Sequence, residues 1–307
     1  MPAKRKRRFK ISNRRTYKKI VIFLFFILFF GLIVFLNSLN SFFKDDPKLA
    51  ISVYKNSGEV DLFVLDKTNK EITKIVIPGD TLVDAANRYG YFRLANIKRL
   101  SDTKGEKGIL LVGTIVKNFK FPVYVWTSEE QEFLFEKNLI EAFNSFVRPG
   151  SSNLKFGDNF AILIFSLLVP ENKRLNINLD ETGYLKEEKL PDGNLGFLIT
   201  LSEPPTKIAS VFADENFYNK NQKVAIISDP DLYLDVKYVV KVIEVIGSKV
   251  VVVRNSKVED TNCRVIGLDR LAVVKLARVF GCVYNLGEGE EGVDITLTLG
   301  RNFDSLF

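Results

Sequence analysis

A basic tail followed by a long uncharged apolar run most constrains what this 307-residue chain can fold into. Residues 1–19 hold ten lysines and arginines and no acidic residue, and residues 20–36 read IVIFLFFILFFGLIVFL. About 20 apolar residues cross the bilayer hydrocarbon as a helix, because only a helix satisfies its own backbone there. We therefore predict a cytoplasmic tail over residues 1–19 and a transmembrane helix over residues 20–43.

The residues on either side of this run set the expected orientation. Positive charge is retained on the cytoplasmic side, so the chain from about Lys44 onward is expected outside the cell as a single-pass membrane protein. A cleaved signal peptide would have a shorter apolar core and a small-residue cleavage site, which NSLNSFF does not offer. The KRKRR stretch also suits nucleic acid, but beside an apolar run we interpret it as orienting the membrane segment and expect no nucleic-acid partner.

Composition removes several kinds of chemistry. The chain has no histidine, which excludes Ser-His-Asp and Cys-His nucleophiles and histidine-ligated metals. Its two cysteines are too few for a cysteine-rich zinc site and form no CxxC pair. The ten basic residues of the tail exceed the net charge of +7, so the remaining chain is slightly acidic. Any chemistry must therefore use carboxylates, lysine, arginine, hydroxyls or a bound cation.

The pattern after the apolar run predicts an α/β domain over residues 48–202. Runs rich in β-branched residues predict strands at 49–54, 60–66 and 71–78, and a further strand is expected at 121–126. Helical spacing predicts helices at 81–90, 105–120 and 127–150 and a buried helix at 158–169, too short to span a bilayer. Residues 185–201 read as a hairpin around a Pro-Asp-Gly turn.

The Ser-Glu-Pro-Pro stretch at 202–205 predicts a domain boundary, because two prolines interrupt both helices and ladders. Beyond it we expect a small α/β domain over residues 206–307. The expected helices are 207–213, 234–247 and 268–281, the last two ending at glycine, and the expected strands are 223–228, 249–255, 263–267 and 293–300.

Two resemblances follow from these patterns. Residues 206–307 resemble the LytR C-terminal domain, through IEVIG at 243–247 and the closing DITLTLG at 294–300. Residues 60–126 resemble the LytR-CpsA-Psr (LCP) family, membrane-anchored phosphotransferases that move glycopolymers from a polyprenyl pyrophosphate carrier to the cell wall. VDLFVLDKTNKEITKIVIPGD matches the family's aspartate-containing strand, turn and strand ending in Ile-Pro-Arg-Asp. The resemblance implies a role in cell-envelope biogenesis, with a polyprenyl-linked glycopolymer or peptidoglycan as partner.

The same resemblance assigns candidate site residues. Asp61 stands at the position of the cation-binding aspartate and would hold Mg²⁺, Asp80 is the aspartate of the turn, and Gly79 replaces its arginine. Arg93, Lys98 and Arg99 are the candidate phosphate contacts.

Bidentate arginine supplies both charge and fixed geometry to a phosphate. Losing such a group costs phosphoryl transfer about 3 to 5 orders of magnitude. We therefore predict a binding or scaffolding protein with a degenerate site, in which Asp80 caps a helix that starts at Thr81. The alternative is an active Mg²⁺-dependent phosphotransferase in which Asp61 holds the metal and Arg93 contacts phosphate.

The cysteines leave two possibilities open. Cys263 precedes an expected strand and Cys282 follows the helix that packs back towards it, so they can form a disulfide in an oxidising exterior. Two buried free thiols are the other reading.

Overall fold

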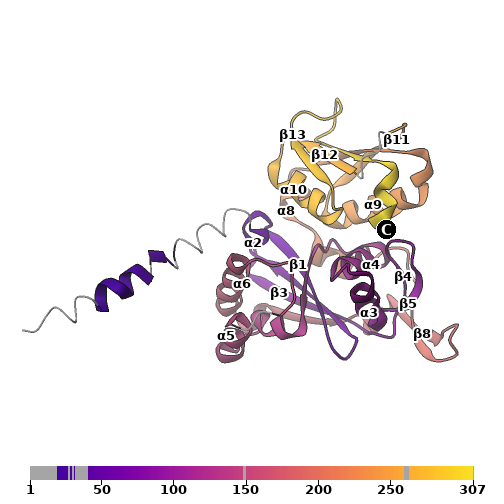
Figure 1. The fold of residues 1–307 in the computed structure, drawn as a ribbon. Helices are drawn as coiled ribbons and strands as arrows, with labels where there is room; N and C mark the ends of the chain where they lie inside the picture. Colours follow the sequence, from indigo (N-terminus) through magenta and orange to yellow (C-terminus); the bar gives the residue numbers. More distant parts are fainter. Residues whose placement is uncertain are drawn as a thin grey trace, which may run out of the picture.

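Two mixed α/β units stack on one another in the computed structural model, and an apolar segment projects from their side (Figure 1). The structure describes residues 19–26, 28–29, 31, 41–147, 150–258 and 263–306. Residues 19–26 are helical, and no helix within the described residues is long and apolar enough to cross a membrane. The predicted tail up to residue 18, and residues 27, 30 and 32–40 of the predicted span, lie outside the described residues. The end of the predicted span, residues 41–43, belongs instead to the folded unit, where Ser41 caps a short helix that begins at Phe42.

The N-terminal unit, residues 41–201, is built on a five-stranded sheet of order β6-β1-β2-β3-β7. β1, β2 and β3 form an antiparallel meander, whereas β6 and β7 run parallel to their neighbours β1 and β3. Its strands are β1 (Lys48–Tyr54), β2 (Val60–Asp66), β3 (Glu71–Ile77), β6 (Val125–Ser128) and β7 (Arg174–Asn178), with hairpins β4–β5 (Leu82–Ala85, Gly90–Arg93) and β8–β9 (Leu185–Lys189, Leu195–Ile199).

Helices cover both faces of this sheet, with α3 and α4 on one side and α5 and α6 on the other (Figure 1). They are α2 (Phe42–Asp45), α3 (Leu94–Lys104), α4 (Ile109–Phe119), α5 (Leu139–Val147) and α6 (Phe156–Leu168), with 3-10 helices η1 (Glu129–Phe135), η2 (Glu171–Lys173) and η3 (Leu179–Thr182). Every residue of the central strand β2 is buried, as expected for a strand covered on both faces.

Two helix predictions for this unit are wrong: one predicted helix is a β-hairpin, and another is divided into two shorter helices. Residues 81–90, predicted as a helix, form the β4–β5 hairpin, in which Asn87 and Arg88 adopt φ of 61° and 57° at the turn. Positive φ at both central residues is the geometry of the tight hairpin turn, and Asn is one of the residues that tolerates it. Asp80 therefore caps no helix. The predicted helix 127–150 is divided into η1 and α5.

The predicted buried helix 158–169 begins earlier, at Phe156, and is buried on one face only. Phe160, Ile164 and Leu168 are 38%, 43% and 75% exposed. The pattern did not predict this exposure because the helix is apolar all round, a composition typical of full burial.

The C-terminal unit, residues 206–306, has a five-stranded sheet of order β11-β10-β14-β12-β13. The predicted elements are present, and the strand β13 was missed. The elements are α7 (Thr206–Phe212), α8 (Glu215–Tyr218), β10 (Lys223–Ser228), η4 (Pro230–Leu232), α9 (Tyr233–Ile246), β11 (Lys249–Asn255), β12 (Cys263–Gly267), α10 (Arg270–Val279), β13 (Val283–Leu286), β14 (Ile295–Leu299) and η5 (Arg301–Leu306). Gly247 ends α9 with φ of 108°, the left-handed cap that its position predicted.

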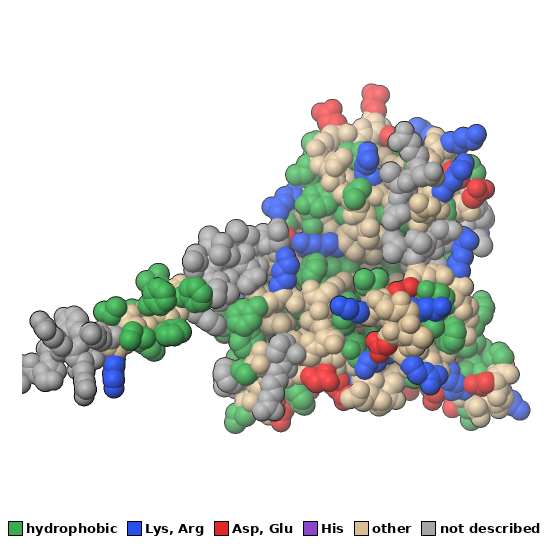
Figure 2. All heavy atoms as spheres, viewed as in Figure 1, with side chains coloured by type: hydrophobic (Ala, Val, Ile, Leu, Met, Phe, Trp, Pro, Cys, Tyr) green, Lys and Arg blue, Asp and Glu red, His purple; other side chains and the backbone are tan. Residues whose placement is uncertain are grey.

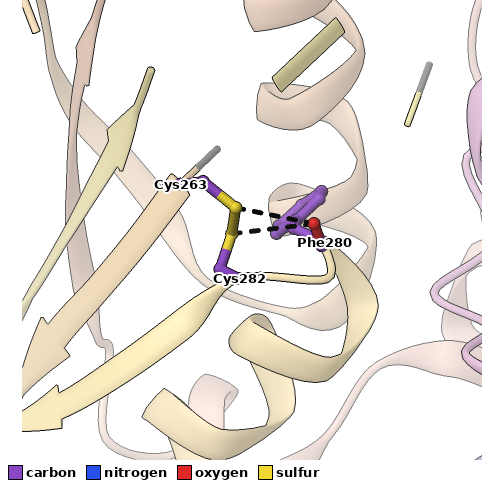
Figure 3. The surroundings of a disulfide bond; sticks show 3 residues. All are labelled: Cys263, Phe280 and Cys282. Atoms are coloured by element: carbon purple, nitrogen blue, oxygen red, sulfur yellow. Dashed lines mark hydrogen bonds between the residues drawn. A yellow bond between two sulfur atoms is a disulfide. The ribbon is translucent and has the colours of Figure 1, made fainter. Parts of the chain in front are cut away.

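Cys263 and Cys282 form a disulfide, with Cα atoms 4.8 Å apart. The bond joins the start of β12 to the residue that precedes β13, and both sulfurs face the carbonyl oxygen of Phe280 at 3.6 and 3.7 Å (Figure 3). Of the two possibilities that the sequence left open, the structure has the disulfide. It ties the start of the edge strand β13 to the start of its neighbour β12.

A buried cation joins the two units. The Lys275 ammonium group of α10 contacts Asp46 at 2.9 Å, just before β1, and Asp214 at 2.7 Å, the N-cap of α8. It also donates to the carbonyl of Lys48 at 2.9 Å. Burial lowers the pKa of Lys275, but its two aspartates outweigh that effect and the pKa is raised. Further along α10 at this interface, Arg278 pairs with Asp45 at 2.8 Å.

Candidate functional site

Gly79 lies where the chain has no room for a side chain. A Cβ added to Gly79 would lie 2.5 Å from the carbonyl oxygen of Gly58 and 3.2 Å from the Cβ of Ala95. The Gly58 loop is itself held by hydrogen bonds between Lys55 and Glu59 and between Gly58 and Lys55, at 2.9 and 3.0 Å. The Pro-Gly-Asp turn, which resembles Pro-Arg-Asp, therefore packs directly against the β1–β2 loop. An arginine at position 79 would push the backbone of Gly58 away.

The first backbone N–H groups of α3 already have hydrogen-bond acceptors within the chain. The backbone N–H groups of Leu94 and Ala95 donate to the carbonyl oxygens of Thr81 and Gly79 at 2.8 and 2.9 Å. Free N–H groups at a helix N-terminus are what make it a phosphate-binding site. Here these two donors stabilise the turn instead.

Arg93 and Asp80, two of the candidate site residues, form an ion pair that the sequence did not predict. Nη1 of Arg93 contacts Asp80 at 2.7 Å, and its Nε and Nη2 atoms contact the two carboxylate oxygens of Asp192 at 2.9 and 3.1 Å. Asp192 belongs to the β8–β9 turn. The hydrogen bonds to Asp192 and then to Asp80 raise the pKa of Arg93, and the bond from Arg93 lowers the pKa of Asp192. The fork geometry that would grip a phosphate is already used on a carboxylate.

Asp61 belongs to a second, separate cluster on the face covered by η1. Its carboxylate is fully buried, and Oδ2 lies 2.8 Å from the ammonium group of Lys55 and 2.7 Å from that of Lys74. Both lysines also contact Glu132, at 3.2 and 2.9 Å. Two acids and two bases thus form a closed four-residue network, which we call the buried ion network.

Opposing effects act on the acids of this network. Burial raises the pKa of Asp61 against the opposing effect of the two lysines. For Glu132 burial also raises the pKa, but the hydrogen bond from Lys74 and the other contacts outweigh it and the pKa is lowered. The lysines therefore serve mainly to balance buried charge, since an unpaired buried charge is far more costly than a paired one.

Mg²⁺ does not fit this arrangement. The described residues contain no group of three or more acidic, histidine or cysteine side chains that would hold a metal ion. At Asp61 two ammonium groups already occupy positions at which a divalent cation would bind, and like charge repels it.

Lys98 and Arg99 line one small pocket at the ends of β1 and α3. It holds about 270 Å³ and is also lined by Lys55 and Asn56. The ammonium group of Lys98 lies 4.3 Å from the centroid of the Tyr54 ring, which stacks on Trp126. Glu59 and Asp102 line it too, so the pocket, which we call the basic pocket, combines three cationic and two acidic side chains with an aromatic wall.

Apolar side chains of β2, β3 and α4 fill the core around the strand that carries Asp61. Leu62, Ile75, Ile115 and Phe119 are all fully buried, and Phe119 stacks on Phe121 with ring centroids 5.7 Å apart.

Sequence reasoning missed four residues that decide the state of the site: Lys55, Lys74, Glu132 and Asp192. Lys74 carried a signal, because it lies in a strand on the same face as Val76, the residue that pairs with Asp61, two positions away. Glu132 and Asp192 carried none, since each reaches the site from an element distant in sequence.

Comparison with known proteins gives distant structural likenesses. No family model matches the sequence, and no curated protein matches it. Among solved structures, Bacillus subtilis TagT is similar over 53% of this chain and 89% of its own, at 12% identity and a TM-score of 0.37. B. subtilis TagV covers 50% of this chain and 92% of its own, at 11% identity and a TM-score of 0.38. Lin1025 of Listeria innocua covers the same shares at 11% identity and a TM-score of 0.36.

One of the similar structures is described as the LytR-CPS2A-psr family protein YwtF (TagT) with bound octaprenyl pyrophosphate lipid. It covers 53% of this chain at 11% identity and a TM-score of 0.37. That description names the family that residues 60–126 resemble in sequence. At these identities and TM-scores, the activities of the similar proteins are not transferred to this chain.

Proposed function

We propose that this protein is a membrane-anchored, extracytoplasmic binding or scaffolding protein of cell-envelope biogenesis, with an LCP-like domain over residues 48–202 and a LytR C-terminal domain over residues 206–307. The basic tail and apolar run support the anchor and its orientation. The residues quoted for the two resemblances support the envelope role.

The ion pairs of Arg93 are the observation that favours a binding function over catalysis. Its guanidinium group is held by two carboxylates, Asp80 and Asp192, and Gly79 supplies no second cation. A phosphoryl-transfer site needs preorganised positive charge aimed at the reacting phosphate. Here the positive charge nearest to the Pro-Gly-Asp turn is neutralised from within the chain.

The basic pocket is the binding surface that this proposal uses. Lys98 and Arg99 line it and belong neither to the Arg93 cluster nor to the buried ion network, which holds Lys55, and lysine binds phosphate as a point charge. We propose that it contacts the anionic group of a polyprenyl-linked glycopolymer or of the wall.

The same pocket favours the second candidate, an active phosphotransferase. In that reading Lys98 and Arg99 take over the phosphate contact that the family assigns to its arginine. The reaction would have to proceed with Asp61 paired to lysines rather than to Mg²⁺.

The test uses the full chain in lipid vesicles with a polyprenyl pyrophosphate and Mg²⁺. The fluorescence of Trp126, the single tryptophan, reports binding because its ring borders a neighbouring pocket that Lys98 also lines. We expect saturable binding, weakened by Lys98→Gln and unchanged by Lys189→Gln on the exposed end of β8, with no phosphate release. Phosphate release that Asp61→Asn abolishes would establish the enzyme instead.

A further inference from the structure

Helix α6 presents an apolar stripe to the outside of the N-terminal unit. Phe156, Phe160, Ile164 and Leu168 follow one another at intervals of four residues, so they lie along one side of the helix. Phe156 is half-buried, and the exposed fraction rises along the stripe from 38% at Phe160 to 75% at Leu168. A solvent-facing helix side normally carries charged or polar residues. α6 has one charged residue, Asp158, and that residue is buried.

Asp158 ties this helix to the beginning of the folded part of the chain. One carboxylate oxygen of Asp158 accepts hydrogen bonds from the hydroxyl of Ser41, at 2.5 Å, and from the backbone N–H of Phe43, at 3.0 Å. The ring of Phe43 packs on Phe165 of α6, with centroids 5.5 Å apart. The chain that leaves the apolar run is therefore docked directly on α6.

Chain length limits how far α6 lies from the end of the apolar run. Five residue steps separate Leu36 from Ser41. A fully extended chain covers at most about 3.6 Å per residue, so Ser41 lies within about 18 Å of Leu36. This upper limit exceeds the thickness of one interfacial region, about 5 to 7.5 Å, so the chain length allows Ser41 and α6 to lie at the membrane surface. An amphipathic helix at that surface buries its apolar side by about 5 to 10 Å.

We propose that the outer side of α6 lies in the membrane surface, in contact with lipid, next to the point where the apolar run enters. This inference rests on the anchoring in the proposed function and adds a second membrane contact made by the folded unit. The neighbouring helix α5 extends the surface with Ile140 and Val147, 73% and 57% exposed. The two helices lie on the side of the unit from which the N-terminal segment projects (Figure 1).

Apolar side chains on both the projecting segment and the edge of the unit that faces it favour lipid over a second copy of the chain. Figure 2 shows hydrophobic side chains on the projecting segment and again at the edge of the lower unit nearest to it. A membrane that receives the apolar run is already within reach of this edge. Contact with it covers the stripe without a further partner.

The experiment places a fluorescent probe on the stripe of the full chain. Leu168→Trp is reconstituted in phosphatidylcholine vesicles with or without bromine on the acyl chains, and the signal of the wild type, which carries Trp126, is subtracted. Leu195→Trp on β9, where Leu195 is 64% exposed, is the matched control. Bromine in the acyl chains should quench the tryptophan introduced on α6, and its emission should shift to shorter wavelength, while the control shows neither change. Ile164→Trp repeats the measurement one turn away.

Flotation of the vesicles separates the two ideas. A chain that floats with the vesicles while neither stripe position is quenched overturns the α6 contact and leaves the anchor standing. A chain that does not float overturns both. Dimers in detergent that Leu168→Glu dissociates, together with unquenched stripe positions in vesicles, would assign the stripe to a second copy and overturn the inference.

Discussion

Replacing Gly79 by alanine tests whether the Pro-Gly-Asp turn is closed. The added Cβ would approach the Gly58 carbonyl oxygen to 2.5 Å, and that atom is backbone in a loop fixed by two hydrogen bonds. Forcing an extra carbon into a packed site costs about 1 to 3 kcal/mol. Alanine also restricts the unfolded chain, which returns about 0.4 to 1 kcal/mol. We expect a net loss of about 1 kcal/mol in the free energy of unfolding of the N-terminal unit.

Urea unfolding of the full chain, followed by the fluorescence of Trp126, measures this change. Trp126 is 5% exposed and lies in β6, so its signal follows the N-terminal unit. With a slope of about 1 to 3 kcal/mol per molar urea, the midpoint should fall by roughly 0.3 to 1 M.

Gly287→Ala is the matched control for this experiment. A Cβ at Gly287 meets no atom within 4 Å, and its φ is not in the left-handed region. Because Gly287 lies in the C-terminal unit, this variant is followed by circular dichroism, and its midpoint should stay the same or rise slightly. A Gly79→Ala protein as stable as the wild type would refute the reasoning, because it would show that the Gly58 loop yields and that a side chain at this turn has room.

Three further predictions concern the units and their junction. Lys275→Ala should lower the free energy of unfolding by about 3 to 5 kcal/mol, measured by urea unfolding, because it leaves two buried carboxylates without a cation; an unchanged midpoint would contradict the buried pairing. Cys282→Ser should cost the C-terminal unit about 3 kcal/mol, seen as a lower midpoint by circular dichroism that matches the reduced wild type. Burial, and to a smaller extent the charge of Lys117, lowers the pKa of Lys120 from 10.5 to about 8. Between pH 8 and 10.5 the folded state therefore binds fewer protons than the unfolded state, and the free energy of unfolding should rise with pH. Lys120→Met should abolish the rise.

Local patterns predicted the parts of the fold that depend on neighbours in sequence. The strands β1 to β3 were found because their β-branched residues lie between polar turns, and α9 was found because Gly247 marks its end. The β4–β5 hairpin was mistaken for a helix because its apolar residues also satisfy helical spacing over this short segment. Turn geometry at Asn87 decided between the two readings, and that preference is weak in a single sequence.

The candidate site was predictable only as far as one strand and its turn. Asp80 and Arg93 meet because they face one another across the end of a short hairpin, within 13 residues. The acids that pair with the cations of the two clusters are distant in sequence. Glu132 lies 58 residues from Lys74, and Asp192 lies 99 residues from Arg93. A sequence pattern records which groups are present but not which distant charges they meet, so the state of the site depends on tertiary contacts.

The short segment from Ser41 to Lys48 also has a mechanical consequence. It is fastened to α6 through Asp158 and to α10 through Lys275 and Arg278. A pull on the N-terminal segment would therefore be shared by both units in parallel, rather than passing through the first unit to reach the second. Because this segment continues covalently into β1, its contacts with α10 and α6 should break under tension before β1 leaves its sheet.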